Sequence, residues 1–451
     1  MENHPVWKQG WNGGQNMTQQ AGKKEKFVFT KEEKSWIFQD WANSAFSIMV
    51  VTAVFPLFYK AVASNAGVSD ADSTAYLGYA NSIATASVAL MAPVLGAIAD
   101  YKGFRRPMFT TTTLLGILGT LGIAFMPGGG AVDIAWLALL VLYVLSNIGF
   151  SSANVFYDAS LMDVTTSSRM SRVSSTGFGM GYIGSSIPFI VFILIYTTGI
   201  LPVSADWVIR GGFVLTALWW FVFTIPYWRN VEQKMYIERQ PHVVKNSFKR
   251  LWGTLKRIKE YRNVFLFLLA YFFYIDGVGT IFKMATAVGA DVGLSGTSLI
   301  IVMLITQVVA FPFSILYGVL SKRFGDKKMI YAGIVTYLFI CLYALTLDSL
   351  QTFLILAFLV GTAQGGIQSL SRSFFGRLIP DKRHNEFFGL YNIFGKFSSI
   401  LGTTLMGLIT QQTGNSLDGV FSLIALFLLG GALLLFVKDP KQHEGDMQEA
   451  A

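Results

Sequence analysis

Twelve apolar segments of membrane-spanning length leave few folds open to this chain. A helix needs about 20 apolar residues to cross the hydrocarbon core of a bilayer. The segments are 36–60, 75–99, 108–127, 131–157, 174–198, 207–228, 264–285, 297–320, 329–347, 351–371, 386–410 and 418–437. Only 14% of the 451 residues are charged and 53% are hydrophobic, which is unlike a water-soluble domain. We predict an all-α membrane protein with twelve transmembrane helices in two six-helix bundles.

Polar stretches divide these segments into a simple organisation. The predicted parts are a disordered tail over 1–35, an N-terminal bundle over 36–228, a linker over 229–263, a C-terminal bundle over 264–437 and a second tail over 438–451. The first apolar run is too long for the apolar part of a signal peptide, so we expect it to remain as a helix.

The linker is predicted to contain an amphipathic helix. Its apolar residues recur at helical spacing and its cations lie on the opposite side. The residues concerned are Phe248, Leu251, Trp252, Leu255 and Ile258, against Lys249, Arg250, Lys256, Arg257 and Lys259. Such a helix is expected to lie on the membrane surface, as an anchor or as a regulatory element.

The distribution of cations predicts the orientation. Of the 35 Lys and Arg residues, 31 fall in the tails, in the linker and in alternate loops, all on one face of the predicted bundle. Because cytoplasmic loops are enriched in Lys and Arg, we expect a multi-pass protein of the cytoplasmic membrane with both termini cytoplasmic. The net charge of +9 is then a topology signal, and nucleic acid is not an expected partner.

Two polar loops, 222 residues apart, repeat the same pattern. Each copy has a Gly, a second Gly seven residues later, and two cations nine and ten residues after the first Gly. The predicted gating residues are Gly96, Asp100, Gly103, Arg105 and Arg106 in the first copy, and Gly318, Gly325, Lys327 and Lys328 in the second. The second copy has Lys322 where the first has Asp100, so a role for that acid is expected in the first copy only. The spacing resembles the loop signature of the major facilitator superfamily.

Polar side chains inside the spanning segments are the candidate binding residues, because burying them in a bilayer is costly. They follow one face of helices one, four, seven and ten, with a cation in helix eleven. The predicted cavity residues are Asp40, Asn43, Asn147, Ser151, Asn154, Asp158, Asp276, Thr280, Lys283, Gln364, Gln368 and Lys396. In the major facilitator architecture, those four helices line the central cavity.

For several of these residues, a purely structural role is an open alternative to solute binding. Asp40 could stabilise a helix end, and the stripe from Asn147 to Asp158 could bond neighbouring helices without contacting a solute. Asp276 and Lys396 are at similar depth and could form a permanent ion pair or a switchable one. Asp158 could instead pair with a loop cation.

Two further stretches narrow the resemblance. The segment from Phe38 to Ala45 and the segment from Gly365 to Lys396 look like the branch that includes the autophagy-related vacuolar amino-acid effluxers and their bacterial relatives. That resemblance implies signature positions at Asp40, Asn43, Gln368, Arg372 and Lys396. It also implies that Asp100 helps to hold the halves together on the cytoplasmic side in the outward-facing state. Tyr101 stands where the family usually has a basic residue.

The expected function is secondary active transport. We expect a small polar solute, amino acids or related metabolites among them, to cross by alternating access. Proton coupling is the favoured drive, with Asp276 or Asp40 as carrier, and the chain is expected to be a monomer in the lipid bilayer. The alternatives are an exporter coupled to another ion, a lipid or lipid-linked sugar flippase of the same fold, and a non-transporting membrane sensor.

Enzymatic chemistry is not expected from this sequence. The stretch Gly179-Met-Gly181-Tyr-Ile-Gly184 matches a dinucleotide fingerprint, but it lies inside an apolar helix with no preceding strand. The chain has one cysteine, Cys341, and four scattered histidines, which give no metal-ligand pattern. We therefore predict no cofactor, no metal and no catalytic residues.

Overall fold

A computed structural model describes residues 27–126, 135–256 and 259–439 as a nearly all-helical protein. Its only strand-like contact in these ranges is an isolated bridge between Tyr101 and Ile237. Eleven helical spans among the described residues are long and apolar enough to cross a membrane. Helix α14 (His384–Thr413), which has 30 residues and is not one of these eleven, runs beside α3 (Asp70–Ala99). This confirms the predicted all-α membrane fold.

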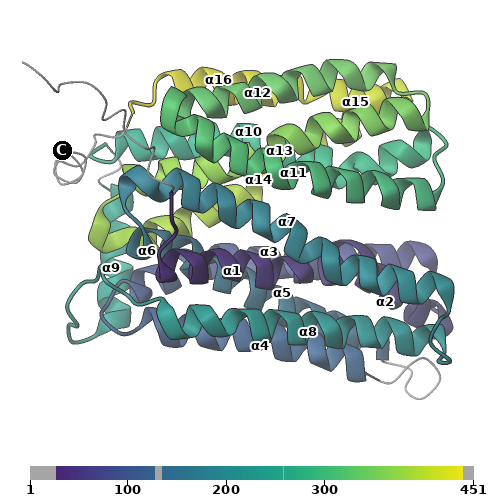
Figure 1. The fold of residues 1–451 in the computed structure, drawn as a ribbon, viewed down its shortest axis with the longest axis horizontal. Coiled ribbons are helices and arrows are strands. Elements are labelled where there is room, and N and C mark those ends of the chain that lie inside the picture. Colours follow the sequence, from purple (N-terminus) through teal and green to yellow (C-terminus); the bar gives the residue numbers. More distant parts are fainter. Residues whose placement is uncertain (1–26, 127–134, 257–258, 440–451) are drawn as a thin grey trace, which may run out of the picture.

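The first half of the chain forms one layer of parallel and antiparallel helices (Figure 1). Its first span is continuous through α1 (Lys31–Phe46), a π-helical stretch (Ser47–Ala53) and α2 (Val54–Asn65). The other spans, besides α3, are α4 (Arg105–Phe125), α5 (Ala135–Ala159), α7 (Ser167–Thr198) and α8 (Ala205–Asn230), and the short helix α6 (Leu161–Val164) follows α5.

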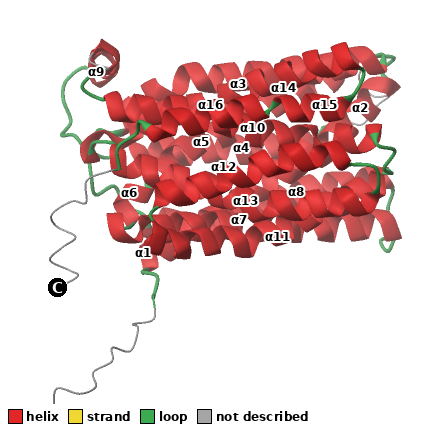
Figure 2. Ribbon diagram, turned by 90° about the horizontal axis from the view of Figure 1, so that it is seen from above, coloured by secondary structure: helices red, strands yellow, loops and turns green. Residues whose placement is uncertain are grey.

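The second half forms the other layer. Besides α14 it contains α10 (Arg262–Asp291), α11 (Gly296–Phe324), α12 (Asp326–Tyr343), α13 (Leu350–Leu378), α15 (Ser416–Ser422) and α16 (Ile424–Leu435). Short 3-10 turns cover Ala344–Thr346 and Asp381–Arg383. The segment of the chain that connects the halves contains α9 (Val243–Lys256), which lies at one end of the bundle and runs across the spanning helices (Figure 2). We call this end the linker end.

The predicted segments largely coincide with the observed helices and differ from them at the helix ends. Residue 127 of the third predicted segment and residues 131–134 of the fourth lie outside the described ranges, and residues 347, 436 and 437 of two later segments are not helical. Helix α1 begins at Lys31 because Thr30 and Glu33 form a capping box, and α13 continues to Leu378. Helix α7 begins seven residues before the predicted apolar run. The extra turns of α7 and α13 are polar because they bond the other half of the protein, as described below. The last predicted segment is divided into α15 and α16.

The second glycine of each repeated loop takes the conformation that a tight turn requires. Gly103 has φ of +80° and Gly325 has φ of +86°, a region that other residues rarely adopt. Pro107 lies in the first turn of α4, where its missing N–H costs nothing. The two loops therefore reverse the chain tightly at the linker end.

The hydrophobic core joins the halves at the linker end. One cluster combines buried residues of the first half, such as Trp36 and Phe156, with residues of the second, such as Tyr271 and Phe388. A second cluster around Phe55 lies almost wholly within the first half. Helix α3 packs against α14, and α7 packs against α11 and α13. The residues 1–26 and 440–451 of the predicted tails lie outside the described ranges.

Candidate functional site: a cavity closed at the linker end

One buried arginine joins the two halves. Arg372 on α13 is 3% exposed, and its Nη1 donates to Asp158 Oδ1 at 3.0 Å. Its Nη2 donates to Asp40 Oδ2 at 3.2 Å, and its Nε donates to Ser174 Oγ at 2.9 Å. The guanidinium also lies over the Trp36 ring, 4.6 Å from its centre. Two carboxylates of the first half thus share one cation of the second half, which leaves one negative charge uncompensated within the cluster when both are ionised.

A cavity of about 390 Å³ lies beside Arg372, between the halves. The charged and amide side chains that line it are Asp158, Lys283, Gln364, Gln368, Arg372 and Asn392. Its aromatic side chains are Phe178, Tyr271, Phe282 and Tyr391. Gln364 is 6% exposed, and its Oε1 accepts no hydrogen bond from the described residues. A buried amide oxygen without a partner, facing a cavity, is suited to accept a hydrogen bond from a solute.

The loop of Asp100 meets the start of α14. The Asp100 side chain is fully buried and accepts from the Asn385 backbone N–H at 2.9 Å and the Glu386 backbone N–H at 3.3 Å. Arg250 of α9 donates to Asp100 at 3.1 Å and to Glu386 at 2.8 Å, and it lies over the Tyr101 ring. The linker therefore supplies the cation that is missing at position 101.

The second loop copy bridges the halves in a different way. Asp326, four residues after Lys322, accepts from the Ser171 hydroxyl of α7 at 2.9 and 2.7 Å. Arg377 of α13 also pairs with Asp326 and donates to Ser171 Oγ at 2.9 Å. The expectation that an acid acts in the first copy only is therefore incomplete: the second copy has an acid at the interface, at another position.

The first glycine of each copy allows the halves to approach closely. A Cβ at Gly96 would lie 2.2 Å from the Asn385 carbonyl oxygen, and a Cβ at Gly318 would lie 2.6 Å from the Ser175 Cβ. These are the crossings of α3 with α14 and of α11 with α7. Only a residue without a side chain fits at either crossing.

The remaining predicted loop cations stabilise the linker end. Arg105 pairs with Asp163, which also lies 3.1 Å from His384 Nε2 of α14. Arg106 donates to the Trp228 carbonyl at 2.7 Å. Lys327 donates to the carbonyl of Leu435, the last residue of α16, and to that of Val437 just beyond it. Lys328 is exposed.

Most of the stripe on α5 faces neighbouring helices of the same half. Asn43 Nδ2 donates to Asn154 Oδ1 at 2.7 Å. Asn147 Nδ2 lies 3.4 Å from Asn81 Oδ1, and Ser151 Oγ donates to Asn147 Oδ1 at 3.3 Å. Only Asp158 of this stripe lines the cavity. It pairs with Arg372, whereas Arg169, in the first turn of α7, pairs with Glu33.

The residues that were predicted to share one face of α10 have different surroundings. Lys283 lines the cavity, but Asp276 is fully buried and faces α14. Both Asp276 carboxylate oxygens accept from the Gly402 backbone N–H at 2.9 Å, and Thr280 Oγ1 lies 3.3 Å from Oδ1. The side chain of Lys396 lies outside the described part of the structure, so its pairing with Asp276 stays a prediction.

Sequence reasoning did not find the aromatic lining of the cavity or Asn392 and Arg250. The aromatic residues lie within apolar runs, where nothing distinguishes a cavity residue from a core residue. Arg250 was one of many linker cations. No group of His, Cys, Asp and Glu suited to a metal ion occurs among the described residues.

Two helical halves that close at one end around a central polar cavity are the architecture of a major facilitator superfamily transporter. A solved structure of the proton:xylose symporter XylE, bound to 6-bromo-6-deoxy-D-glucose, aligns with a TM-score of 0.71 at 13% identity, over 93% of this chain and 98% of that one. FucP in the outward conformation aligns with a TM-score of 0.65 at 14% identity, over 90% and 98% of the two chains. At these identities the likeness concerns the fold.

The chain belongs to the Atg22-like vacuole effluxer family, whose model matches residues 30–164 and 159–446. It is 53% identical over 424 residues to the uncharacterized MFS-type transporter YxiO of Bacillus subtilis, covering 93% of this chain and 98% of that protein. It is 30% identical over 285 residues to autophagy-related protein 22-2 of Aspergillus clavatus, covering 57% of this chain and 46% of that protein. The chain is therefore a secondary transporter by family, and its match spans about half the length of the fungal relative.

Proposed function

We propose that this protein is a proton-coupled transporter of small polar solutes, amino acids or related metabolites among them, in the cytoplasmic membrane. In this proposal the linker end is cytoplasmic, as the distribution of cations predicts. The observation that carries the proposal is the Arg372 cluster, in which two carboxylates of one half share a cation of the other half beside the cavity.

The conformation is closed at the linker end. Hydrogen bonds join the halves at this end, among them those of the Asp100 loop, of Ser175 on α7 and of Asp40 on α1. Because these contacts lie on one side of the cavity, the other side is the route by which a solute enters in this state. Opening the linker end requires the Arg372 cluster to separate.

Protonation of a carboxylate in this cluster links the proton to that opening. Neutral Asp40 attracts the guanidinium less than charged Asp40, so binding a proton weakens the contact between the halves. Asp40 is the preferred carrier because Asp158 keeps the shorter bond to Arg372 and a further contact at 3.5 Å from Asn392 Nδ2. Asp276, which forms no ion pair with a described cation, is the alternative carrier.

The cavity supports a solute that carries both charges. Lys283 offers a cation for a carboxylate, and Asp158 offers an anion for an ammonium group. Gln364 and Gln368 provide neutral donors and acceptors between aromatic walls. A zwitterion the size of an amino acid matches this lining.

The test is counterflow of a labelled amino-acid mixture into liposomes that contain the purified protein and the same unlabelled mixture. The variants are Asp40→Asn and Asp276→Asn, with Asp348→Asn, at an exposed loop position, as the matched control. We expect the wild type and Asp348→Asn to exchange solute and to concentrate it with a proton gradient, and Asp40→Asn to exchange without concentrating it. Loss of concentration in Asp276→Asn alone would move the carrier to α10. Absence of exchange by folded wild-type protein would contradict the proposed solute class, and lipids would be screened next.

A further inference from the structure

Helix α9 has an inner face that joins the two halves. Arg250 bonds Asp100 of the first half and Glu386 of the second, and Thr254 Oγ1 donates to Glu386 Oε1 at 2.8 Å. Ser247 on the same face is fully buried. A displacement of α9 would therefore remove ligands from two buried carboxylates at the point where the halves meet.

The next face of α9 is apolar and uncovered. Val244, Phe248 and Trp252 follow one another at four-residue spacing and are 55%, 54% and 61% exposed. Exposed lysines, Lys245 and Lys249, border this stripe. Figure 2 shows α9 nearly end-on at the point where the spanning helices stop, so its axis lies in the plane of the membrane surface. This is the geometry of a helix that inserts its apolar side into the headgroup region.

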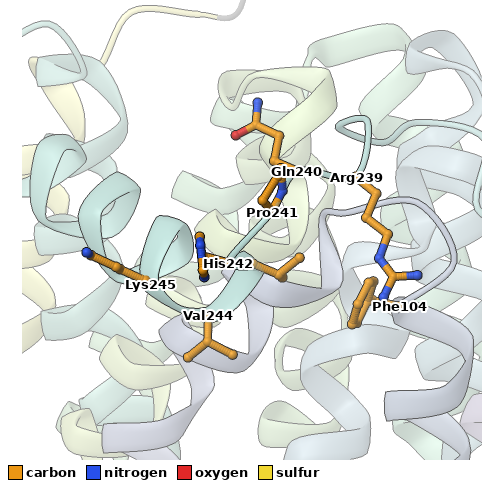
Figure 3. A pocket seen from close by; sticks show the side chains of 8 residues that line it. Phe104, Arg239, Gln240, Pro241, His242, Val244 and Lys245 are labelled. Atoms are coloured by element: carbon orange, nitrogen blue, oxygen red, sulfur yellow. The ribbon is translucent and has the colours of Figure 1, made fainter.

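An open pocket of about 870 Å³ lies at the start of α9 (Figure 3). Arg239 lies over the ring of Phe104 on one side, 5.2 Å from its centre, and His242 and Lys245 line the other side. Neither Arg239 nor Lys245 forms an ion pair with a described carboxylate. The carboxylate next to Arg239 in the sequence, Glu238, pairs with Lys102 at 3.8 Å instead. The pocket thus presents uncompensated positive charge beside an apolar stripe.

The backbone at this pocket is held in an unusual conformation. His242 has φ of 57°, and it is the only non-glycine residue with positive φ in the described ranges. Asn246 holds it, because its backbone N–H donates to the His242 carbonyl at 3.0 Å and its Nδ2 donates to the Pro241 carbonyl at 2.7 Å. Strain of this kind persists where the surrounding structure enforces it and is concentrated at binding sites.

We propose that this pocket binds the headgroup of an anionic phospholipid, whose acyl chains lie along Val244, Phe248 and Trp252, and that the bound lipid stabilises the conformation closed at the linker end. Arg239 and Lys245, which lie on opposite sides of the pocket (Figure 3), supply the positive charge that attracts the headgroup. A lipid fits better than a soluble phosphate because only a lipid also covers the apolar stripe. The lipid acts on the transport cycle through the inner face of α9, where Arg250 bonds Asp100 and Glu386.

The experiment compares the full chain in nanodiscs of zwitterionic phosphatidylcholine with nanodiscs that also contain anionic phosphatidylglycerol. The pocket variant is Arg239→Gln with Lys245→Gln. The control is Lys322→Gln with Arg323→Gln, which removes the same charge from exposed positions at the same end. Native mass spectrometry counts retained phosphatidylglycerol. Electron–electron resonance between spin labels at the exposed positions 31 and 382, in a Cys341→Ala background, measures the closed population.

We expect phosphatidylglycerol to raise the closed-to-open ratio of the wild type and of the control by about fivefold. The pocket variant should lose both the retained lipid and this increase. Unchanged lipid retention in the pocket variant, or equal loss in both variants, would overturn the site. Lipid retained without a change in the closed population would overturn the coupling. An equal increase produced by soluble glycerol phosphate in phosphatidylcholine nanodiscs would show a soluble-anion site instead.

Discussion

Replacement of Arg250 by Gln should shift the protein away from the conformation that is closed at the linker end. Arg250 is 17% exposed on its side chain, whereas the Asp100 and Glu386 side chains that it bonds are fully buried. Glutamine is too short and uncharged, so it cannot hold both carboxylates. The closed state would then contain a buried charge on Asp100 with no neighbouring cation from α9.

The expected free-energy cost of this substitution depends on the hydrogen bonds and ion pairs that the two carboxylates keep. Removing one partner of a buried ion pair costs about 3–5 kcal/mol when the other charge is left uncompensated. Here Glu386 keeps Arg383 at 2.7 Å, and Asp100 keeps two backbone N–H donors and the Asn385 side-chain amide. We therefore expect a cost of about 2–3 kcal/mol, which lowers the closed-to-open ratio by about 30- to 160-fold.

The same spin-label distance between positions 31 and 382 measures this ratio at pH 7.5. Asp100→Asn in the Arg250→Gln background is the matched test, because it removes the orphan charge and should restore about 1–2 kcal/mol of the loss. An Arg250→Gln protein with the wild-type distance distribution would refute the reasoning. So would strictly additive losses in the double variant.

Two further predictions concern the same interface. Burial raises the pKa of Asp100 from its ordinary 3.8 to about 6, because loss of water outweighs the neighbouring charges of His384 and Arg250 and the Asn385 bond. The closed state therefore binds this proton more tightly than an open state with Asp100 in water. The resulting stabilisation is complete below about pH 3.8 and lost as the pH rises through about 6. From pH 7 to pH 5 the closed-to-open ratio of the wild type should therefore rise about tenfold, or ~1.4 kcal/mol, relative to that of an Asp100→Asn protein, in which the opposing effect of Asp40 protonation is the same. An Asp100→Asn protein with the same pH profile would assign the effect elsewhere. Gly318→Ala should cost the closed state about 1–3 kcal/mol, because the new Cβ meets Ser175. Gly407→Ala, whose Cβ would meet open space, is its control, and equal closed populations in the two variants would contradict this prediction.

The spanning helices were predictable because hydrocarbon imposes one requirement on all of them. Each span must satisfy its backbone hydrogen bonds internally over about 20 residues, and a run of apolar residues records that requirement directly. The prediction stopped short at the start of α7 and at the end of α13. Those turns, which contain Ser171, Arg372 and Arg377, are polar because their partners are in the other half, and an apolar count cannot include them.

The candidate site was predictable in part. Helical spacing placed Asp158, Lys283, Gln364 and Gln368 on faces of the right helices, and these residues line the cavity. The same spacing placed Asp276 beside Lys283, yet Asp276 faces Gly402 of α14. Spacing shows which residues share a face of a helix. It does not show toward which neighbour that face is turned.

By itself, the sequence determined that apolar helical spans make up most of the chain, where the tight turns at Gly103 and Gly325 lie, and that the two loops repeat one pattern. These follow from local rules, since a backbone in lipid must be helical and a positive φ favours glycine. Only the tertiary structure decided that Arg372 serves Asp40 and Asp158 together and that Arg250 of the linker supplies the cation for Asp100. These contacts join residues 150 to 332 positions apart. They depend on how whole helices pack, and no local pattern records that packing.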